Sequence, residues 1–333
     1  MGPRAFWFIV NERTWREHEK AGIAAINDPH FQPQRQSLAQ RQSAIAEVAG
    51  IRPGDLMFFY VMGTMKILGI YEATTRSYFD TQPLFSEAVH IKAAHPFRVG
   101  FREIANYPNP IDISDIWSAR DQGLIWTVQQ SRGDAVGVHA CIGLMRPDVR
   151  LMKRIFAERN ILELAPTPAP PLPRSLSPLP IELTTFGGRL RYENALKALL
   201  LEDLAEGHHK EVLGNYDDVL VNVPTSARME MDVLMLRYSN QDIIWFQVVE
   251  LKASEFTQHE LTRLIDYEEW LIRVPAKGNR RAVYPIALAL DFSEEVRLFV
   301  KRREDYGVKS IRLVAYSLSK SSTRHLDLRE VAP

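Results

Sequence analysis

Hydrophobic and polar positions along the first half of the chain predict both strands and helices. Runs rich in β-branched and aromatic residues, typical of strands, are AFWFIVN, RPGDLMFFYVMG after its Pro-Gly turn, and MKILGIYEATT. Helical periodicity is present in RTWREHEKAGIAAI, SLAQRQSAIAEVAGI and VRLMKRIFAERN. Further strands are expected from Ala94 to Phe101 and around IWTVQQ. Residues 1–160 are therefore predicted to form one mixed α/β domain.

The last part of the chain, residues 181–333, has a regular order of predicted elements. A helix, RYENALKALLLEDLAEG, precedes the strands DDVLVNVP, RMEMDVLML and DIIWFQVVELK. The helix HELTRLIDYEEWLIRV follows, with Thr257 and Glu260 at capping-box spacing. A strand AVYPIALAL, a helix SEEVRLFVKRREDYG and a strand KSIRLVAYSLS complete the order α-β-β-β-α-β-α-β. This order predicts a mixed sheet with helices on its faces, a fold of the α/β (α+β) class.

Between the two regions, residues 161–180 contain the proline-rich stretch APTPAPPLPRSLSPLP. Proline lacks an amide donor and fixes φ, so this stretch is predicted to be extended and semi-rigid. It can be a linker between domains or a peptide that binds a partner. A linker is favoured, because sequence with predicted helices and strands flanks it on both sides.

Composition narrows the class of protein only slightly. A chain of 333 residues is long enough for two domains. Its formal net charge of zero gives no sign of nucleic-acid binding, although a local basic groove would be enough to bind nucleic acid. The single cysteine, Cys141, excludes an internal disulfide and fits a reducing compartment. We find no membrane-length apolar run and no apolar core of a signal peptide. A cytoplasmic protein without a membrane partner is expected.

The first candidate for a functional site is the strand that ends in VVELKAS, because it carries an acidic and a basic residue within an apolar run. Side chains alternate across a strand, so Glu250 and Lys252 share the face of Phe246 and Val248. Burying an unpaired carboxylate or ammonium is costly. The turn YSNQD would fold the preceding strand back, which brings its Asp232 near Glu250.

Two neighbouring carboxylates repel unless a proton or a cation lies between them, and Mg²⁺ prefers such oxygen ligands. A third acid, Glu193, lies on the helical face that also carries Leu196, Leu200 and Leu204. The alternative is a buried structural ion pair between Lys252 and one acid. Three acids and one lysine on apolar faces favour a metal site.

These residues resemble the PD-(D/E)XK nuclease superfamily, whose pattern is an acid on the first helix, an Asp on one strand and (D/E)-x-K on the next. The matching positions are Glu193, Asp232 and Glu250-Leu251-Lys252, over roughly residues 185–320. Met231 precedes Asp232, where the family often has proline. The resemblance implies a restriction-endonuclease-like αβββαβ fold and phosphodiester hydrolysis with Mg²⁺, for which Mn²⁺ is a possible substitute.

By this resemblance, Asp232 and Glu250 would bind the metal, with the carbonyl of Leu251 as a candidate third ligand. Lys252 would orient the attacking water or stabilise charge on the phosphate. Glu193 would bind a second metal ion or hold a water molecule on the metal.

Other polar residues of this half have weaker assignments. Arg263 and Tyr267 lie one turn apart on the next helix, where phosphate contact and packing are equally favoured. His208 and His209 are expected to be exposed loop histidines.

The first half is rich in aromatic residues, most of which must be core. In FWFIVN, Trp7 faces away from Phe6 and Phe8. The stretches FWFIVNERTW, RPGDLMFFYVMGTMKILGIYEAT, HPFRVGF and LIWTVQQSRGDAVG resemble the EVE domain of the PUA-like superfamily, which is related to YTH and ASCH domains. This implies a β-barrel with flanking helices that binds a modified, flipped base by stacking and edge hydrogen bonds. The implied base-binding residues are Asn11, Trp15, Tyr60 and Trp126, and the implied phosphate contacts are Arg98 and Arg132.

Together the two resemblances imply a modification-dependent endonuclease that cuts double-stranded DNA carrying a modified base, such as 5-methylcytosine. Cutting both strands needs two active sites, so a homodimer is expected. The alternatives are a repair or structure-specific nuclease, a nuclease acting on RNA, and a non-catalytic nucleic-acid-binding protein with a nuclease-like fold.

Overall fold

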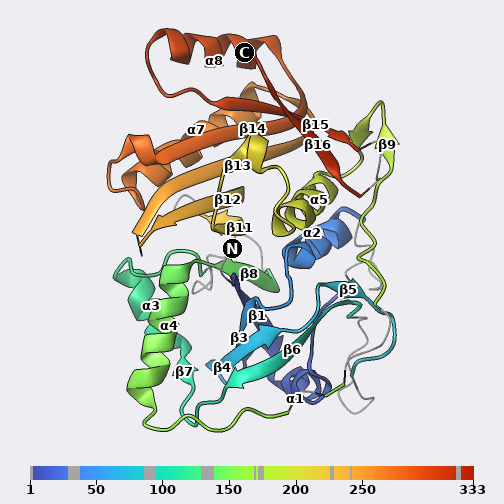
Figure 1. Ribbon diagram of the computed structural model, residues 1–333, viewed down its shortest axis with the longest axis vertical. Coiled ribbons are helices and arrows are strands. Elements are labelled where there is room, and N and C mark those ends of the chain that lie inside the picture. The colour runs from blue at the N-terminus through green and yellow to red at the C-terminus, as the bar shows by residue number, and fades with distance from the viewer. Residues whose placement is uncertain are drawn as a thin grey trace. The chain divides into compact units, whose positions relative to one another are not determined.

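The computed structural model describes residues 3–28, 38–85, 95–128, 139–168, 170–171, 176–225, 229–240, 242–319 and 324–333. The chain divides into two compact units, Met1–Pro180 and Ile181–Pro333, coloured blue to green and yellow-green to red in Figure 1. Across the described ranges, every helix is too short or too polar to cross a membrane.

The first unit is built on an eight-stranded sheet. Its main path has the order β2-β6-β4-β3-β1-β8, with β5 paired to β6 and β7 paired to β4. β1 runs parallel to β3, and the other pairs are antiparallel. The strands are β1 (Ala5–Asn11), β2 (Ile23–Ile26), β3 (Leu56–Met62), β4 (Lys66–Ala73), β5 (Tyr78–Phe79), β6 (Phe97–Ala105), β7 (Ile111–Asp112) and β8 (Cys141–Leu144).

The helices of this unit are α1 (Glu12–Ala21), α2 (Leu38–Ala49), α3 (Ile113–Asp121) and α4 (Arg146–Arg159). The predicted first helix was too long. Gly22 adopts the left-handed conformation (φ 61°) that ends α1, and the following IAAI becomes strand β2. The strand predicted around IWTVQQ was also wrong, because residues 125–128 form no strand and the remaining two lie outside the described residues.

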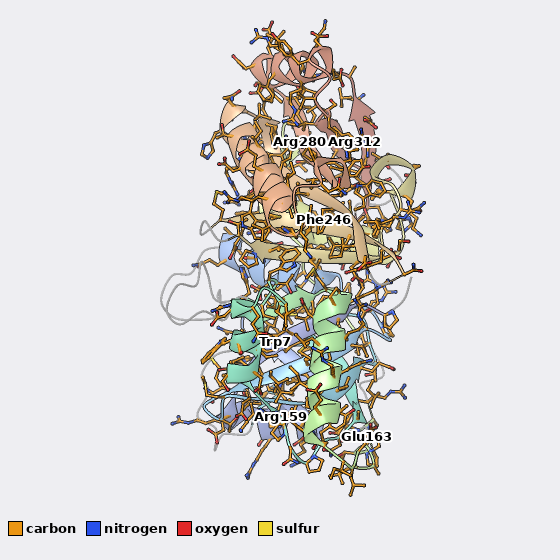
Figure 2. All side chains as sticks on the ribbon, turned by 90° about the vertical axis from the view of Figure 1, so that its left-hand side faces the viewer. Trp7, Arg159, Glu163, Phe246, Arg280 and Arg312 are labelled. Carbon is orange, nitrogen blue, oxygen red and sulfur yellow. The ribbon has the colours of Figure 1, made fainter. Side chains whose placement is uncertain are left out.

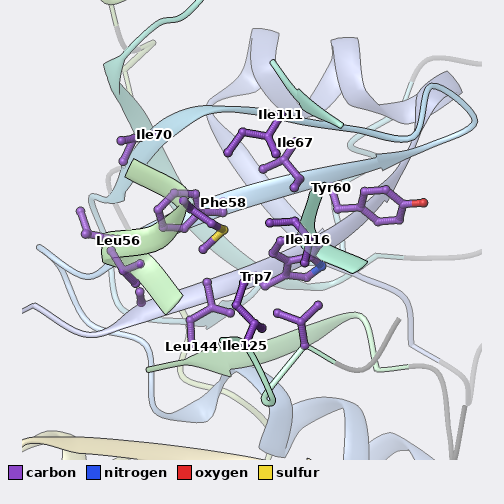
Figure 3. Close-up of a cluster of buried hydrophobic side chains, with 14 of the residues drawn as sticks. Trp7, Leu56, Phe58, Tyr60, Ile67, Ile70, Ile111, Ile116, Ile125 and Leu144 are labelled. Atoms are coloured by element: carbon purple, nitrogen blue, oxygen red, sulfur yellow. The ribbon is translucent and has the colours of Figure 1, made fainter. Parts of the chain in front are cut away.

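Apolar side chains on one face of this sheet form a core cluster around Trp7, Phe58 and Tyr60 (Figure 3). Trp7 is fully buried, and its ring stacks on that of Tyr60 with 5.8 Å between ring centroids. Trp15 packs on the opposite face, because its partner Phe59 is the residue next to Tyr60 and side chains alternate along β3. The aromatic richness of the first half is thus largely explained by two packed layers.

The segment of residues 161–180, which contains the proline-rich stretch, is held against the rest of the first unit at several points. The Leu164 amide donates to the Asn106 carbonyl at 2.9 Å, and the Phe79 amide donates to the Ser177 carbonyl at 2.8 Å. The Thr167 amide donates to a carboxylate oxygen of Glu103 at 2.8 Å. A free spacer would lack such bonds, so part of this stretch belongs to the first unit.

The second unit contains a six-stranded mixed sheet in the order β11-β12-β13-β14-β15-β16. β13, β14 and β15 are parallel to one another, and the remaining pairs are antiparallel. Figure 2 shows Phe246 of β13 inside this unit, where its side chain is buried. The strands are β11 (Asp218–Pro224), β12 (Glu230–Ser239), β13 (Asp242–Phe256), β14 (Val283–Phe292), β15 (Arg312–Leu318) and β16 (Leu326–Val331).

Three helices of the second unit lie where the hydrophobic pattern predicted them: α5 (Glu193–Ala205), α7 (Gln258–Arg273) and α8 (Glu294–Asp305). The short helix α6 (Lys210–Leu213) and the 3₁₀ helix η3 (Arg280–Ala282) were not predicted. The capping box of α7 is present, since the Thr257 amide donates to Glu260 Oε2 at 3.0 Å. Three strands were not predicted: β16, and the short hairpin of β9 (Thr185–Phe186) and β10 (Arg189–Leu190).

Candidate functional site

Three neighbouring strands place polar residues in one row across the sheet. In β12 and β13, Val233 pairs with Val249, so the next position places Asp232 opposite Glu250. In β11, Asn222 lies between the residues that pair with Val233 and Met231, and is therefore opposite Asp232. Asn222 has a positive φ of 50°, a conformation that Asn tolerates better than most residues. The row is thus Asn222, Asp232 and Glu250.

Asp232 is buried and both of its carboxylate oxygens have partners. The Leu251 amide donates to Oδ2 at 3.0 Å, and Lys197 Nζ of α5 lies 2.6 Å from Oδ1. Lys197 is also buried and donates to Asn222 Oδ1 at 3.0 Å. Burial alone would raise the pKa of Asp232, but the Lys197 ammonium and the Leu251 amide outweigh it and lower this pKa. Asp232 is therefore ionised.

Glu250 is 1% exposed, and neither of its carboxylate oxygens accepts a hydrogen bond from a donor among the described residues, although a protonated Glu250 can donate to the adjacent Asp232 carboxylate. Arg263 NH1 of α7 lies 3.1 Å from Oε1, at ion-pair distance but without hydrogen-bond alignment. Burial and the nearby Asp232 carboxylate raise the pKa of Glu250 to about 9. Glu250 therefore holds a proton at neutral pH unless a further cation reaches it.

Lys252 lies between two other acids at the end of the site. Its Nζ is 3.0 Å from Glu260 Oε1 and 3.6 Å from Glu193 Oε2. Burial opposes the charge of Lys252, but these two carboxylates raise its pKa. Burial raises the pKa of Glu193, and the Asp232 carboxylate raises it further. Glu193 thus interacts electrostatically with both Lys252 and Asp232.

Arg263 and Tyr267 both reach the site from α7. Arg263 NH2 donates to the Tyr267 hydroxyl at 3.1 Å, and that hydroxyl donates to the Glu230 carbonyl at 2.6 Å. Tyr267 is fully buried, so its role is to hold Arg263 and β12 in place. Arg263 is partly exposed and faces Glu250, which leaves its guanidinium able to meet an anion.

The carboxylate oxygens of Glu250 and Asp232 are suitable ligands for a divalent cation. A buried carboxylate whose oxygens accept no hydrogen bond from a donor needs a proton or a cation, and a hard metal ion binds such oxygens. Asp232 is adjacent, but it would have to release Lys197 to become a ligand. In the described residues, no three His, Cys, Asp or Glu side chains converge as a ready-made metal cage.

Sequence reasoning missed two residues of this site, Lys197 and Glu260. Lys197 is one helical turn after Glu193, inside the otherwise apolar run NALKALLL. A lysine in such a run has the same signal that drew attention to Lys252. Glu260 was recognised only as a helix cap, although a cap residue at the N-terminus of α7 can also face the preceding strand.

The base-pocket candidates of the first unit do not share one surface. Trp15 is 8% exposed, and its ring packs on Phe59, with 4.8 Å between ring centroids, and on Phe101, with 6.3 Å. Tyr60 is 2% exposed on the other face of β3, and its hydroxyl points away from the core cluster (Figure 3) toward Met65 Sδ at 3.0 Å. Both residues therefore have a packing role in this structure.

The other residues that were predicted to contact the base or the phosphate lie at separate positions in the first unit. Asn11 caps α1, where its side chain accepts from the Arg13 amide at 2.9 Å, and Trp126 is half-buried in a loop. Arg98 is 3% exposed and pairs with Asp80 Oδ2 at 2.6 Å, so it is not available to a phosphate in this conformation. Arg132 lies outside the described residues.

The prediction that both loop histidines are exposed was wrong for one of them. His208 is exposed as expected, but His209 is buried against Asp203, with 2.9 Å between Nε2 and Oδ2.

No protein-family model matches the chain, and no curated protein matches it. Solved structures match parts of it. A hypothetical protein from Leishmania major is 13% identical over 47% of this chain and 96% of that chain, with a TM-score of 0.33. The human THYN1 protein in complex with 5-methylcytosine-containing DNA is 10% identical over 46% of this chain and 96% of that chain, with a TM-score of 0.31. A repair endonuclease from Pyrococcus abyssi is 17% identical over 32% of this chain and 43% of that chain, with a TM-score of 0.24.

Proposed function

We propose that the second unit is a Mg²⁺-dependent nuclease and that the chain is a modification-dependent DNA endonuclease. The observation that carries this proposal is the pair of buried carboxyl groups of Glu250 and Asp232, which lie opposite each other, while neither Glu250 oxygen accepts a hydrogen bond from a donor. An apolar residue at position 250 would be less costly for packing, so a cation-binding role accounts better for a glutamate there.

In the proposed site, Glu250 and Asp232 would hold Mg²⁺, with Mn²⁺ as a substitute. The ion would supply Lewis-acid polarisation of a phosphate oxygen and a water molecule of lowered pKa. Lys252 would donate to the phosphate from a position fixed by Glu193 and Glu260. Arg263 would add a second positive charge toward the developing negative charge.

The first unit would select the DNA by binding a modified base, such as 5-methylcytosine, and a homodimer would cut both strands. Trp15, Tyr60 and Arg98 are engaged in packing or an ion pair, so substitutions of other residues in the first unit test which side chains contact the base. Trp126, which is half-buried, is the first of the original candidates to test.

A second candidate function is a non-catalytic nucleic-acid-binding protein with a nuclease-like fold. The observation that favours it is Lys197, whose ammonium lies 2.6 Å from Asp232 and already neutralises it. In this case Lys197 permanently replaces a metal ion. The two candidates differ in whether Asp232 is able to exchange Lys197 for Mg²⁺.

The experiment is digestion of plasmid DNA, with and without 5-methylcytosine, in Mg²⁺, Mn²⁺ or EDTA. The nuclease proposal expects cleavage of modified DNA in Mg²⁺ that Asp232→Asn and Lys252→Gln abolish. Asp305→Asn and Lys301→Gln, on the exposed surface of α8, are matched controls that retain it. Mismatched DNA, branched DNA and structured RNA test the repair and RNA alternatives.

Binding without cleavage of any of these substrates would favour the second candidate. The variant Lys197→Met then tests whether Lys197 is what prevents Mg²⁺ binding and cleavage. If Lys197 replaces the metal, this variant gains affinity for Mg²⁺, measured by calorimetry, whereas the wild type shows none.

A further inference from the structure

A second polar cluster lies in the second unit, where the end of α5 and the turn before α6 meet the start of β16. Its centre is Asp203, which is fully buried. Asp203 Oδ2 accepts from the Leu326 amide at 3.0 Å and lies 2.9 Å from His209 Nε2. Asp203 Oδ1 lies 2.5 Å from His325 Nδ1. One carboxylate therefore orients two imidazole rings that are far apart in sequence.

These contacts fix the proton positions on both rings. The Asp203 carboxylate already accepts from the Leu326 amide, and a carboxylate oxygen accepts hydrogen bonds, so His209 Nε2 and His325 Nδ1 are the donors in these two contacts and carry the ring protons. In a neutral imidazole the other nitrogen then has a free lone pair. These nitrogens are His209 Nδ1 and His325 Nε2.

Both rings line an open hollow with a volume of about 490 Å³. Glu211 and Asp327 also line it, so its walls are acidic. A third ring, His208, lies at the same hollow, with 5.4 Å between its centroid and that of His325. His208 is exposed, and its Nε2 is 3.6 Å from Glu206.

A histidine that donates one ring N–H to a carboxylate and presents the other nitrogen outward is the usual arrangement around a transition metal. We propose that this hollow binds a divalent transition-metal ion of the Zn²⁺ class. His209 and His325 are its ligands, Asp203 positions them, and His208 completes the set. Because no three such side chains already converge in the described part of the chain, His208 has to turn toward the ion.

This site differs in chemistry from the carboxylates of Asp232 and Glu250. Imidazole nitrogens favour Zn²⁺, Co²⁺ or Ni²⁺, whereas carboxylate oxygens favour Mg²⁺. The proposed ion would fasten β16 to the α5–α6 turn, in addition to the ion pair between Arg324 and Glu202. The inference does not rest on the proposed nuclease function.

The test is a titration of the metal-free full-length chain with Co²⁺, followed by visible absorption, and competition with Zn²⁺. Binding of one ion is expected, with at least about a tenfold loss of affinity in His325→Ala and about a 10- to 100-fold loss in Asp203→Asn. His259→Ala removes an exposed histidine from α7 and is the matched control, expected to bind as the wild type does.

A second measurement separates this site from the nuclease carboxylates. An Asp232→Asn, Glu250→Gln double variant is expected to keep its Co²⁺ absorption, and saturating Zn²⁺ is expected to raise the melting temperature of the wild type but not of His325→Ala. Unchanged Co²⁺ affinity in His325→Ala, or loss of binding in the double variant, would overturn the proposal. His325 is partly exposed, so its replacement is compatible with folding.

Discussion

Glu250→Gln is expected to stabilise the second unit, because it removes a buried carboxyl group that is forced to keep its proton. Below pH 4.5 this group is protonated in both the folded and the unfolded chain, so it has no effect on stability. As the pH rises from 4.5 to about 9, the unfolded chain loses the proton and the folded chain keeps it. Stability of the wild type therefore falls over this range.

The size of this loss of stability follows from the number of pH units over which only the folded chain keeps the proton. Each pH unit between 4.5 and pH 7 adds about 1.4 kcal/mol to the cost of retaining the proton, or about 3.5 kcal/mol at pH 7. Glu250 is almost completely buried, so solvent screening does not reduce this value much. Glutamine has a similar shape and no charge to lose. It should therefore recover most of this free energy.

The assay is urea unfolding of both proteins, followed by circular dichroism, from pH 4 to pH 9. The difference in the free energy of unfolding should be near zero at pH 4 and grow with pH in favour of the variant. Adding Mg²⁺ at pH 7.5 should then stabilise the wild type more than Glu250→Gln, because only the carboxylate binds the ion.

Glu268→Gln is the matched control with the opposite expected sign. Glu268 is also buried, but both of its oxygens accept from Arg303, at 2.9 and 2.8 Å. Removing one partner of such a pair costs about 3–5 kcal/mol. If Glu250→Gln is destabilising at every pH, as Glu268→Gln should be, the idea of a buried carboxyl group that keeps its proton is refuted.

Three further predictions concern the first unit. Trp15→Ala should lower the free energy of unfolding by about 3–5 kcal/mol and leave the ratio of affinities for modified and unmodified DNA unchanged. A changed ratio with an unchanged melting temperature would instead indicate that Trp15 lines a base pocket. Gly22→Ala should lower the melting temperature, because φ is +61° and the new Cβ would lie 2.8 Å from Pro170 Cγ; a neutral effect would contradict this contact. A fragment of residues 1–180 should melt at a higher temperature than one of residues 1–160, because only the longer fragment keeps the hydrogen bonds of Leu164 and Ser177. Equal melting temperatures would contradict the packing of residues 161–180 against the first unit.

The sequence predicted those parts of the candidate site that depend on regular geometry. Alternation along β13 placed Glu250 and Lys252 on one face, and the β12–β13 hairpin brought Asp232 opposite Glu250. The pairing of charges could not be predicted in the same way. Whether Lys252 meets Glu260 or Glu250 depends on side-chain torsions and on the position of α7, and neither has a periodic signal.

The elements that were missed share a physical cause. One glycine in the left-handed conformation divided the predicted first helix into α1 and β2, and a single residue of this kind does not change the apolar pattern. The strand β16 is short and largely exposed, so its sequence LDLREV lacks the apolar run that identifies a buried strand. Trp15 entered a core that is formed by strands distant in sequence, which periodicity within one helix does not reveal.

The hairpin of β12 and β13 also has a consequence for the order of folding. Its two strands are joined by a tight turn in which Asn240 has a φ of 57°, so their pairing is local in sequence and should form early. The parallel pairing of β13 with β14 must wait for the α7 crossover. We therefore expect Asp232 and Glu250 to come together before the remaining sheet covers them, while water still screens their repulsion. The unfavourable free energy of burying this carboxylate pair should then arise late in folding, when Lys197 and Arg263 pack against it.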